Sequence, residues 1–201
     1  MEVRAPLRMP KSSIEKFIAS KEKWIEDKLL KSKTQTERRK SFSLDYGSLL
    51  TYRGRQYPIE AKGGSRAGFD GEHFYMPPNL QPEQIKAACV KVYRSLAKQY
   101  LTERTLTLSR LMSVVPADIK ITAARTRWGS CSAKKNINYS WRLVMADDAV
   151  IDYVILHELA HTKEMNHSKK FWAIVESVLS NYREQKIKLK ELQQKLGGED
   201  W

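Results

Sequence analysis

The chain has 201 residues, of which 41% are hydrophobic and 29% are charged, and its formal net charge is +13. This length is enough for one hydrophobic core, or for one core and a small appended domain. No apolar run approaches the roughly 20 residues that a membrane-spanning helix needs, so we do not expect a membrane protein.

The N-terminal segment and the cysteine content both indicate the cellular location. The N-terminal segment MEVRAPLRMPK carries charges and has no apolar stretch, so it does not resemble a secretory signal. The two cysteines, Cys89 and Cys131, lie far apart in the sequence and do not form a disulfide framework. We therefore expect a location in the reducing cytoplasm.

The positive charge is unevenly distributed along the chain. Residues 86–142 contain 12 Lys and Arg against 2 Asp and Glu, whereas residues 143–182 contain 3 against 6. A basic surface of this kind favours an anionic partner, which is a nucleic acid, a nucleotide or an acidic protein. The alternative is that the charge only keeps the protein soluble.

The N-terminal part of the chain predicts one helix and a linker. Residues 2–7 are short and extended in character, and Ser12 to Glu15 form a capping box that opens a helix with one apolar face. We expect this helix to end near Lys31. The polar run KSKTQTERRKS at residues 31–41 is typical of a solvated linker.

The next part predicts β structure followed by a long helix. Residues 49–52 and 56–61 are strand-like, and paired glycines or Asp-Gly mark the turns that follow. Pro82 then begins a helix with a continuous apolar face. Cys89 lies on that face, which predicts a buried cysteine without a redox role.

A second β region precedes the most informative segment. Residues 118–124 begin it, and residues 136–144 alternate between apolar and polar side chains, as a strand with one buried face does. We expect the edge of this second strand to be available to an extended peptide substrate. Residues 125–135 between them predict a turn or a flap. Asp147 or Asp148 is expected to cap the helix that follows.

That helix contains a zinc signature. Residues 151–167, IDYVILHELAHTKEMNH, include H-E-L-A-H, an instance of H-E-x-x-H. His157 and His161 are four residues apart, so on a helix both project from one face and reach the same ion. Glu158 is offset by about 100° around the helix, which places it near the ion without requiring it to bind.

The surroundings of the motif favour a metal over an ordinary structural role. Residues 149–156 are apolar except for Asp152, which predicts a buried helix. Histidines on helices are commonly core or surface residues, but three of the four in this chain fall within residues 157–167. Two imidazoles and a carboxylate on a buried helix need partners, and a divalent metal supplies them.

A catalytic zinc ion typically takes three protein ligands and leaves one position for water. His167 is the best candidate for the third ligand, because it lies at the end of a turn that folds back toward the motif. Glu176, on the following helix, is the alternative. Ser168 is expected to cap that following helix.

The expected chemistry is hydrolysis by a metal-activated water. Zinc lowers the pKa of a bound water towards about 7, and Glu158 is positioned to accept its proton as the general base. The sequence does not identify the group that stabilises the oxyanion. Arg142, Tyr139 and Tyr153 are candidates, and each also has a structural explanation.

Several motifs occur in a fixed order and together resemble a known family. They are V-R-A-P-L-R-M-P at 3–10, R-W-G-S-C-S at 127–132, N-Y-S-W-R-L at 138–143, D-Y-V-I-L-H-E-L-A-H at 152–161 and N-H-S-K-K-F-W at 166–172. The combination closely resembles the YgjP-like family of predicted zinc-dependent hydrolases. That family belongs to the zincin clan, near the SprT-like and Wss-like metalloproteases.

The resemblance implies an α+β, zincin-like metallopeptidase domain with a small mixed or antiparallel sheet, an active-site helix and flanking helices. It implies Zn²⁺ as the cofactor, with His157, His161 and His167 as ligands and Glu158 as the catalytic residue. We expect residues 1–80 to contribute a helix and a small β region, and residues 81–201 to form the catalytic domain, with both parts in one compact unit.

Three functions follow, in decreasing order of support. The first is a zinc metallopeptidase acting on a polypeptide, including a polypeptide bound to nucleic acid, as the resemblance to the SprT-like and Wss-like proteases implies. The second is a metal-dependent phosphohydrolase acting on nucleoside triphosphates, although no phosphate-binding glycine loop is present. The third is a nucleic-acid-binding module with a structural zinc, for which Cys131 would be the fourth ligand. The sequence does not specify the oligomeric state.

Overall fold

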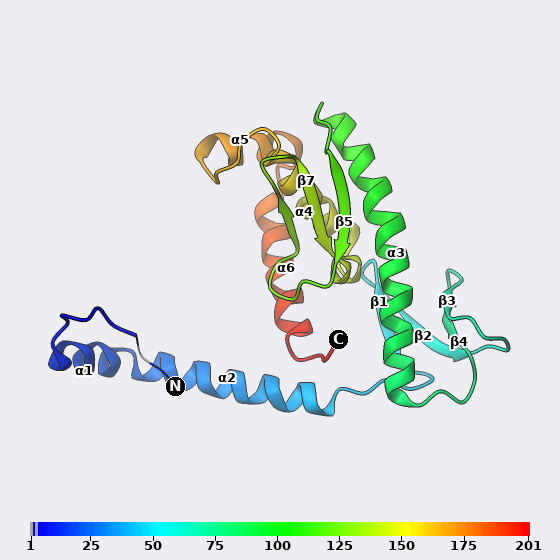
Figure 1. Cartoon of the computed structure of the whole chain (residues 1–201), viewed down its shortest axis with the longest axis horizontal. Coiled ribbons are helices and arrows are strands. Elements are labelled where there is room, and N and C mark those ends of the chain that lie inside the picture. The colour runs from blue at the N-terminus through cyan, green and yellow to red at the C-terminus, as the bar shows by residue number, and fades with distance from the viewer. Residues whose placement is uncertain (1, 3) are drawn as a thin grey trace. The chain divides into compact units, whose positions relative to one another are not determined.

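The computed structural model describes residue 2 and residues 4–201 (Figure 1). The chain separates into two compact units, one formed by residues 1–42 and 196–200 and the other by residues 43–195 and Trp201. These units differ from the predicted segments 1–80 and 81–201, whose division by function stays a prediction. No helix in the described part of the chain is long and apolar enough to cross a membrane.

The first unit consists of two helices and a short C-terminal segment. Helix α1 (Lys11–Ser20) and helix α2 (Glu22–Ser41) follow each other, and neither contains a buried residue. Arg39 of α2 donates a hydrogen bond from Nε to the carbonyl oxygen of Gly197 at 2.6 Å.

Three predictions for this unit are wrong. The single helix that was expected to end near Lys31 is divided into α1 and α2 at Lys21. Helix α1 begins at Lys11 after Pro10, so Ser12 lies inside the helix and caps nothing. The predicted linker at residues 31–41 is helical to its end. Its Lys, Gln, Glu and Arg residues are good helix formers, and no Gly or Pro interrupts the helix that enters it.

The second unit begins with a four-stranded sheet in the order β1-β2-β4-β3. Its strands are β1 (Leu49–Tyr52), β2 (Arg55–Ala61), β3 (Gly68–Phe69) and β4 (Phe74–Met76). Strand β2 pairs antiparallel with β1 and parallel with β4, and β3 pairs antiparallel with β4. The sheet is therefore mixed, as the predicted fold class requires.

A three-stranded sheet in the order β5-β7-β6 lies next to the motif helix. Its strands are β5 (Asp118–Thr122), β6 (Gly129–Cys131) and β7 (Asn136–Ser140). Strand β7 lies in the middle, parallel to β5 and antiparallel to β6. Both of its edges are occupied, so the prediction that this strand offers an edge to a substrate is wrong; β5 and β6 are the outer strands.

The predicted strand 136–144 also ends earlier than expected. Strand β7 stops at Ser140, and Trp141–Met145 form a short 3₁₀ helix, η1. All five residues of η1 are buried, including Arg142. Apolar and polar residues alternate up to residue 144, but the strand ends at Ser140. From residue 141 on, the side chains predicted to face solvent are buried as well.

Helix α3 (Pro82–Leu111) runs along both sheets (Figure 1) and contacts β4, β5 and η1. Its buried side chains form the stripe that the sequence predicts: Ile85, Cys89, Val92, Tyr93, Ala97, Leu101, Thr105, Leu108 and Ser109. Cys89 is fully buried, as predicted, and burial raises the pKa of its thiol to about 12. The helix therefore joins the two sheets into one core.

Three helices complete the second unit: α4 (Asp148–Ala160), α5 (Lys169–Val178) and α6 (Tyr182–Leu196). The prediction that an aspartate caps α4 is confirmed, because Asp147 accepts a hydrogen bond from the backbone N–H of Val150 at 2.9 Å. Ser168 caps α5 by accepting from the N–H of Phe171 at 3.3 Å.

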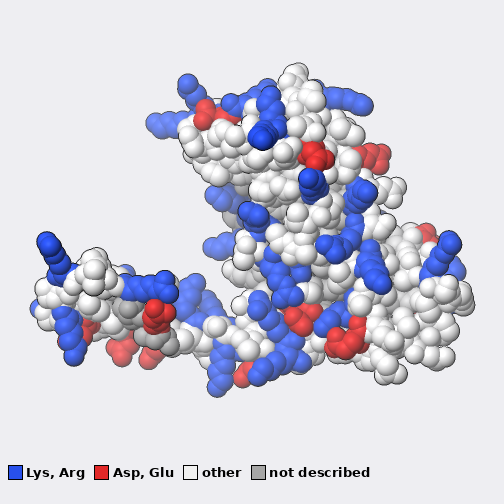
Figure 2. Space-filling model, viewed as in Figure 1, with Lys and Arg blue, Asp and Glu red and all other residues white. Residues whose placement is uncertain are grey.

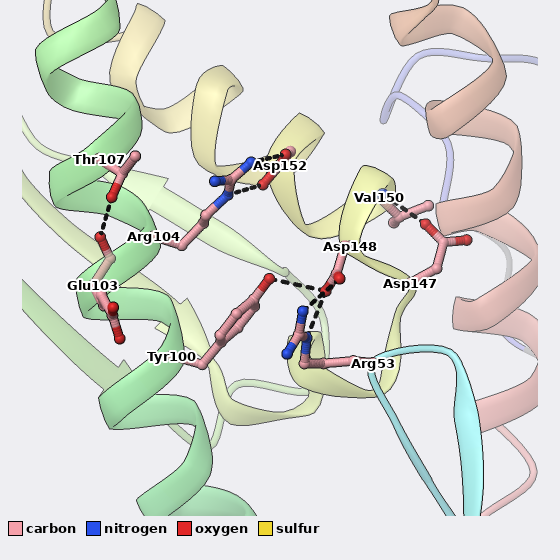
Figure 3. A network of polar contacts seen from close by, with 9 residues as sticks. All are labelled: Arg53, Tyr100, Glu103, Arg104, Thr107, Asp147, Asp148, Val150 and Asp152. Carbon is pink, nitrogen blue, oxygen red and sulfur yellow. Dashed lines mark hydrogen bonds and ion pairs between the residues drawn. The ribbon is translucent and has the colours of Figure 1, made fainter.

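Charged side chains from two other elements hold the first turns of α4 (Figure 3). Arg53 donates two hydrogen bonds to Asp148 at 2.7 and 2.6 Å, and the Tyr100 hydroxyl donates to the same carboxylate at 2.8 Å. One turn further, Arg104 of α3 donates two bonds to Asp152 at 2.7 and 2.6 Å. Bidentate pairs of this kind fix the orientation of both partners.

The turn that carries Arg53 depends on a glycine. Arg53 and Gly54 have φ values of 50° and 74°, as a two-residue hairpin turn between β1 and β2 requires. The backbone of Gly54 lies so close to the α4 cap that an added Cβ would be 2.9 Å from Cβ of Asp147. The hairpin therefore packs directly against the start of α4.

We predict that Gly54→Ala destabilises the protein by about 1–3 kcal/mol, because it combines a left-handed φ with a clash against Asp147. Gly47→Ala is the matched control, since Gly47 has a φ of 84° but nothing within 4 Å of an added Cβ. Urea unfolding measures both. Equal losses in the two variants would show that the contact with Asp147 contributes nothing.

Candidate metal centre

Helix α4 places two histidines of the motif on one face. His157 and His161 are one turn apart, and their ring centroids are 4.9 Å from each other. The helix is almost entirely buried, because apolar residues surround its axis on all sides. The two imidazoles therefore lie at the end of a rigid, enclosed element.

The turn after α4 returns the third histidine to this face. His167 directly precedes the cap of α5, and its Nε2 lies 3.0 Å from Nε2 of His157. One ring nitrogen from each of His157, His161 and His167 can be chosen so that all three lie within 4.8 Å of one another. The structure thus brings together the three histidines that the sequence singled out.

Aromatic side chains of α5 enclose the three imidazoles. The ring centroid of Phe171 lies 4.9 Å from His157, 4.5 Å from His161 and 4.8 Å from His167. Trp172 lies 5.8 Å from both His157 and His167. Phe171 is fully buried, so it forms an apolar floor that limits how far the imidazoles can move.

The environment of His157 and His161 favours the neutral form of imidazole, which is the form that binds metals. Burial, followed by the neighbouring His161 and His167 and by Lys186, lowers the pKa of His157 to about 3. Burial also lowers the pKa of His161, against a hydrogen bond to the backbone of Glu164. Neutral imidazole has one lone pair available for a metal ion.

One hydrogen bond assigns the free nitrogen of His161. Its Nδ1 lies 3.2 Å from the carbonyl oxygen of Glu164. Because a carbonyl only accepts, Nδ1 must carry the proton, and Nε2 is left with its lone pair. Histidine ligands of metals are commonly oriented by such a bond from the second ring nitrogen.

This arrangement fits a zinc ion. With Zn–N bonds of about 2.0–2.1 Å, nitrogens in a tetrahedral site are about 3.3 Å apart. The Nε2 atoms of His157 and His167 are 3.0 Å apart, which is close to that separation. One ring nitrogen of His161 lies within 4.8 Å of these two histidines.

Glu158 lies beside this cluster and is 5% exposed. Burial raises the pKa of its carboxyl to about 8, and the charge of Arg127 opposes that rise. The side chain packs on the backbone of Gly129 in β6, where an added Cβ would be 2.5 Å from Oε1 of Glu158. Glycine at this position therefore makes room for the carboxylate.

A small cavity of about 180 Å³ opens next to Glu158 and His157. Its other walls are mostly apolar or aromatic and come from β6 and its approach, from α4 and from α6: Trp128, Gly129, Tyr153, Val154 and Leu189. Two larger hollows, of about 690 and 440 Å³, include neither Glu158 nor any of the three histidines.

Other candidates from the sequence lie outside the cluster. Glu176, the alternative third ligand, is exposed and forms an ion pair with Arg183 at 2.9 Å. Cys131 is not among the residues that could share an ion with the histidines in the described part of the chain. Burial, and then the charge of Glu158, raises the pKa of its thiol.

The three oxyanion candidates have different positions. Tyr139 is fully buried, with its hydroxyl 3.3 Å from Oγ1 of Thr105, and Arg142 bonds backbone carbonyl groups. Tyr153 alone of the three lines the cavity. Its ring lies 6.0 Å from that of His157, and burial raises its pKa to about 12.

Sequence reasoning missed the side chains that enclose the site. Phe171, Trp172 and Gly129 were not among its candidate site residues. Their position in motifs next to the histidines was an available signal. Leu189 of α6 had no local signal, because it reaches the cavity only through the tertiary fold.

The three histidines could hold a metal ion, and the buried carboxyl group of Glu158 lies next to them. The family model described as YgjP-like, metallopeptidase domain matches residues 1–192. The chain therefore belongs to the YgjP-like family, and the predicted resemblance is confirmed.

Solved structures give a more distant likeness. The metallopeptidase zymogen of Pyrococcus abyssi abylysin matches 44% of this chain and 90% of its own, with 20% identity and a TM-score of 0.41. The metallopeptidase zymogen of Methanocaldococcus jannaschii jannalysin matches 47% of this chain and 95% of its own, with 25% identity and a TM-score of 0.40. No curated protein sequence matches the chain.

We predict that Gly129→Ala lowers hydrolysis on the order of 10²-fold, because the new Cβ displaces the Glu158 carboxylate. Metal content should not change, since the histidines are untouched. Gly63→Ala is the control, because an added Cβ there meets nothing within 4 Å. Steady-state rates of zinc-loaded protein measure the effect, and an unchanged rate in Gly129→Ala would contradict the role given to this contact.

Proposed function

We propose that the chain is a zinc-dependent peptidase in which His157, His161 and His167 hold the ion and Glu158 is the general base. The observation that carries the proposal is the convergence of three histidine rings beside the buried carboxyl group of Glu158. Membership of a metallopeptidase family supports the reaction class. We further propose a cytoplasmic location, in keeping with the two free cysteines.

The histidines and Glu158 have different roles in the proposed hydrolysis. Zinc, when held by the three histidines, would supply a Lewis acid that acidifies water and polarises a carbonyl group. Glu158 would accept a proton from the attacking water as the new C–O bond forms. It would then deliver this proton to the nitrogen that leaves when the C–N bond breaks.

Strand β6 supports a polypeptide as the substrate. One side of β6 pairs with β7, and its other side has no strand partner among the described residues. An extended peptide can add to such an edge through backbone hydrogen bonds. Because Glu158 packs on Gly129 of this strand, a peptide bound there would pass next to the carboxylate.

The cavity beside Glu158 supports an apolar side chain in the substrate. Its walls combine Trp128, Tyr153, Val154 and Leu189, and its lining residues, all in the described part of the chain, include no Lys or Arg. A side chain bound here would therefore be apolar or aromatic.

The same wall gives less support to a nucleotide substrate, because phosphate groups are usually bound by basic side chains or backbone N–H groups. The nucleotide phosphohydrolase and the structural-zinc module stay predictions of the sequence. Many Lys and Arg side chains do cover the face seen in Figure 2. That surface supports nucleic-acid association as an additional property of the peptidase.

We predict that Glu158→Gln retains zinc and loses at least 10²-fold in the hydrolysis of an unfolded protein, because the amide cannot accept the proton. Glu176→Gln is the matched control, since that carboxylate pairs with Arg183 away from the cluster. Zinc content and cleavage rate are measured for the wild type and both variants, and pyrophosphate release is followed from a panel of nucleoside triphosphates.

Equal proteolysis by Glu158→Gln and wild type would remove the general base from this account. Loss of pyrophosphate release instead of proteolysis in the same variant would show that the substrate is a nucleotide.

A further inference from the structure

Trp201 is held in an aromatic socket of the second unit. Its ring meets Tyr93 edge-on at 5.6 Å and 89°, and Trp141 at 5.9 Å and 83°. Those two rings stack on each other at 5.5 Å and 22° and are themselves buried. Aromatic contacts with this edge-to-face geometry are specific as well as apolar.

Two arginines also hold the backbone of Trp201. Arg142 donates a hydrogen bond from Nη2 to its carbonyl oxygen at 3.0 Å, and Arg125 donates from Nη2 to the same oxygen. Two guanidinium groups thus converge on one acceptor. Hydrogen bonds from a charged donor are stronger than neutral ones, so this end of the chain is fixed by both its ring and its backbone.

Arg142 connects this socket to the segment 123–128. While Nη2 bonds Trp201, Nη1 donates to the carbonyl oxygens of Ala123 at 3.1 Å and Ala124 at 3.4 Å. The guanidinium carbon also lies 4.4 Å from the ring centroid of Trp141. Arg142 is only 8% exposed. Burying a cation costs free energy, and the hydrogen bonds to its several acceptors offset that cost.

The segment 123–128 leads directly into the hydrolytic site. Ser140 of β7 anchors it at two points, by donating from Oγ to Ala124 at 2.7 Å and from its N–H to Trp128 at 2.8 Å. Trp128 and the next residue, Gly129, line the cavity, and Gly129 meets Glu158. A change in the path of this segment would therefore move the wall of the site.

We propose that Trp201 is a positioning residue for hydrolysis: through Arg125 and Arg142 it holds the segment 123–128 where Trp128 and Gly129 meet Glu158. This inference rests on the proposed function. Trp201 contacts neither the histidines nor the carboxylate in the interactions that define the socket, so its effect on the reaction is indirect.

A merely structural role makes a different prediction. If Trp201 only adds apolar contacts, its removal lowers the unfolding temperature and leaves the turnover of the folded enzyme unchanged. If it positions the segment, turnover falls in protein that is still folded and zinc-loaded.

The experiment compares zinc-loaded wild type, Trp201→Ala and Trp201→Phe, well below the unfolding temperature of each. Trp24→Ala is the control, because Trp24 is 60% exposed on α2. We measure zinc content, kcat and KM on an unfolded protein substrate, and hydrogen exchange of the amides in residues 123–128.

We expect Trp201→Ala to lower kcat about tenfold with unchanged zinc content, and to accelerate exchange in residues 123–128 about tenfold. Trp201→Phe keeps an aromatic ring in the socket, so its kcat and its exchange in residues 123–128 should be close to those of the wild type. Trp24→Ala should resemble the wild type. An active wild type with an equally active Trp201→Ala would overturn the inference, as would unchanged exchange. An inactive wild type would instead refute the proposed function.

Discussion

The structure depends on the burial of ionisable groups on helix α4. This helix carries two imidazoles and a carboxylate into the core, where charged forms are costly. Burial favours the neutral forms of His157 and His161, whose rings lie 4.9 Å apart on this helix. A third imidazole, from His167, joins them through a short turn. The cluster makes physical sense as a site for a cation, and the surrounding fold serves to keep it in place.

The two ends of α4 are held by different means. At its start, Asp147 caps the helix while Arg53 and Tyr100 fix Asp148 (Figure 3). At its end, aromatic rings of α5 enclose the histidines, and Phe171 lies within 5 Å of all three rings. Polar contacts thus orient the start of α4. Apolar contacts restrict the histidine side chains at its end, where the ion would bind.

The sequence predicted the parts of the site that are local. The spacing of His157 and His161 requires only a helix, and the position of His167 requires only a turn, so both could be read from the chain. The cap at Asp147 and the burial of Cys89 followed from equally local rules. Residues 31–41 are helical although their polar composition predicted a linker, because their side chains have high helix propensity.

The remaining features arise only when distant segments meet. The contact of Gly129 with Glu158 joins a strand to a helix, and no spacing rule connects the two positions. The position of β7 in the middle of its sheet, which leaves β5 and β6 at the edges, depends on the parallel pairing with β5. Arg142 was considered as an oxyanion ligand, but its bonds to backbone carbonyl groups became visible only in the fold.

The most direct test of the central claim is the X-ray absorption spectrum of the zinc-loaded protein at the zinc edge, which counts imidazole ligands and detects sulfur. The account predicts three imidazole nitrogens at about 2.0–2.1 Å and no sulfur, falling to two imidazoles in His167→Ala. A sulfur at about 2.3 Å would indicate Cys131 as a ligand, and two imidazoles in the wild type would exclude His167; either result would contradict the account.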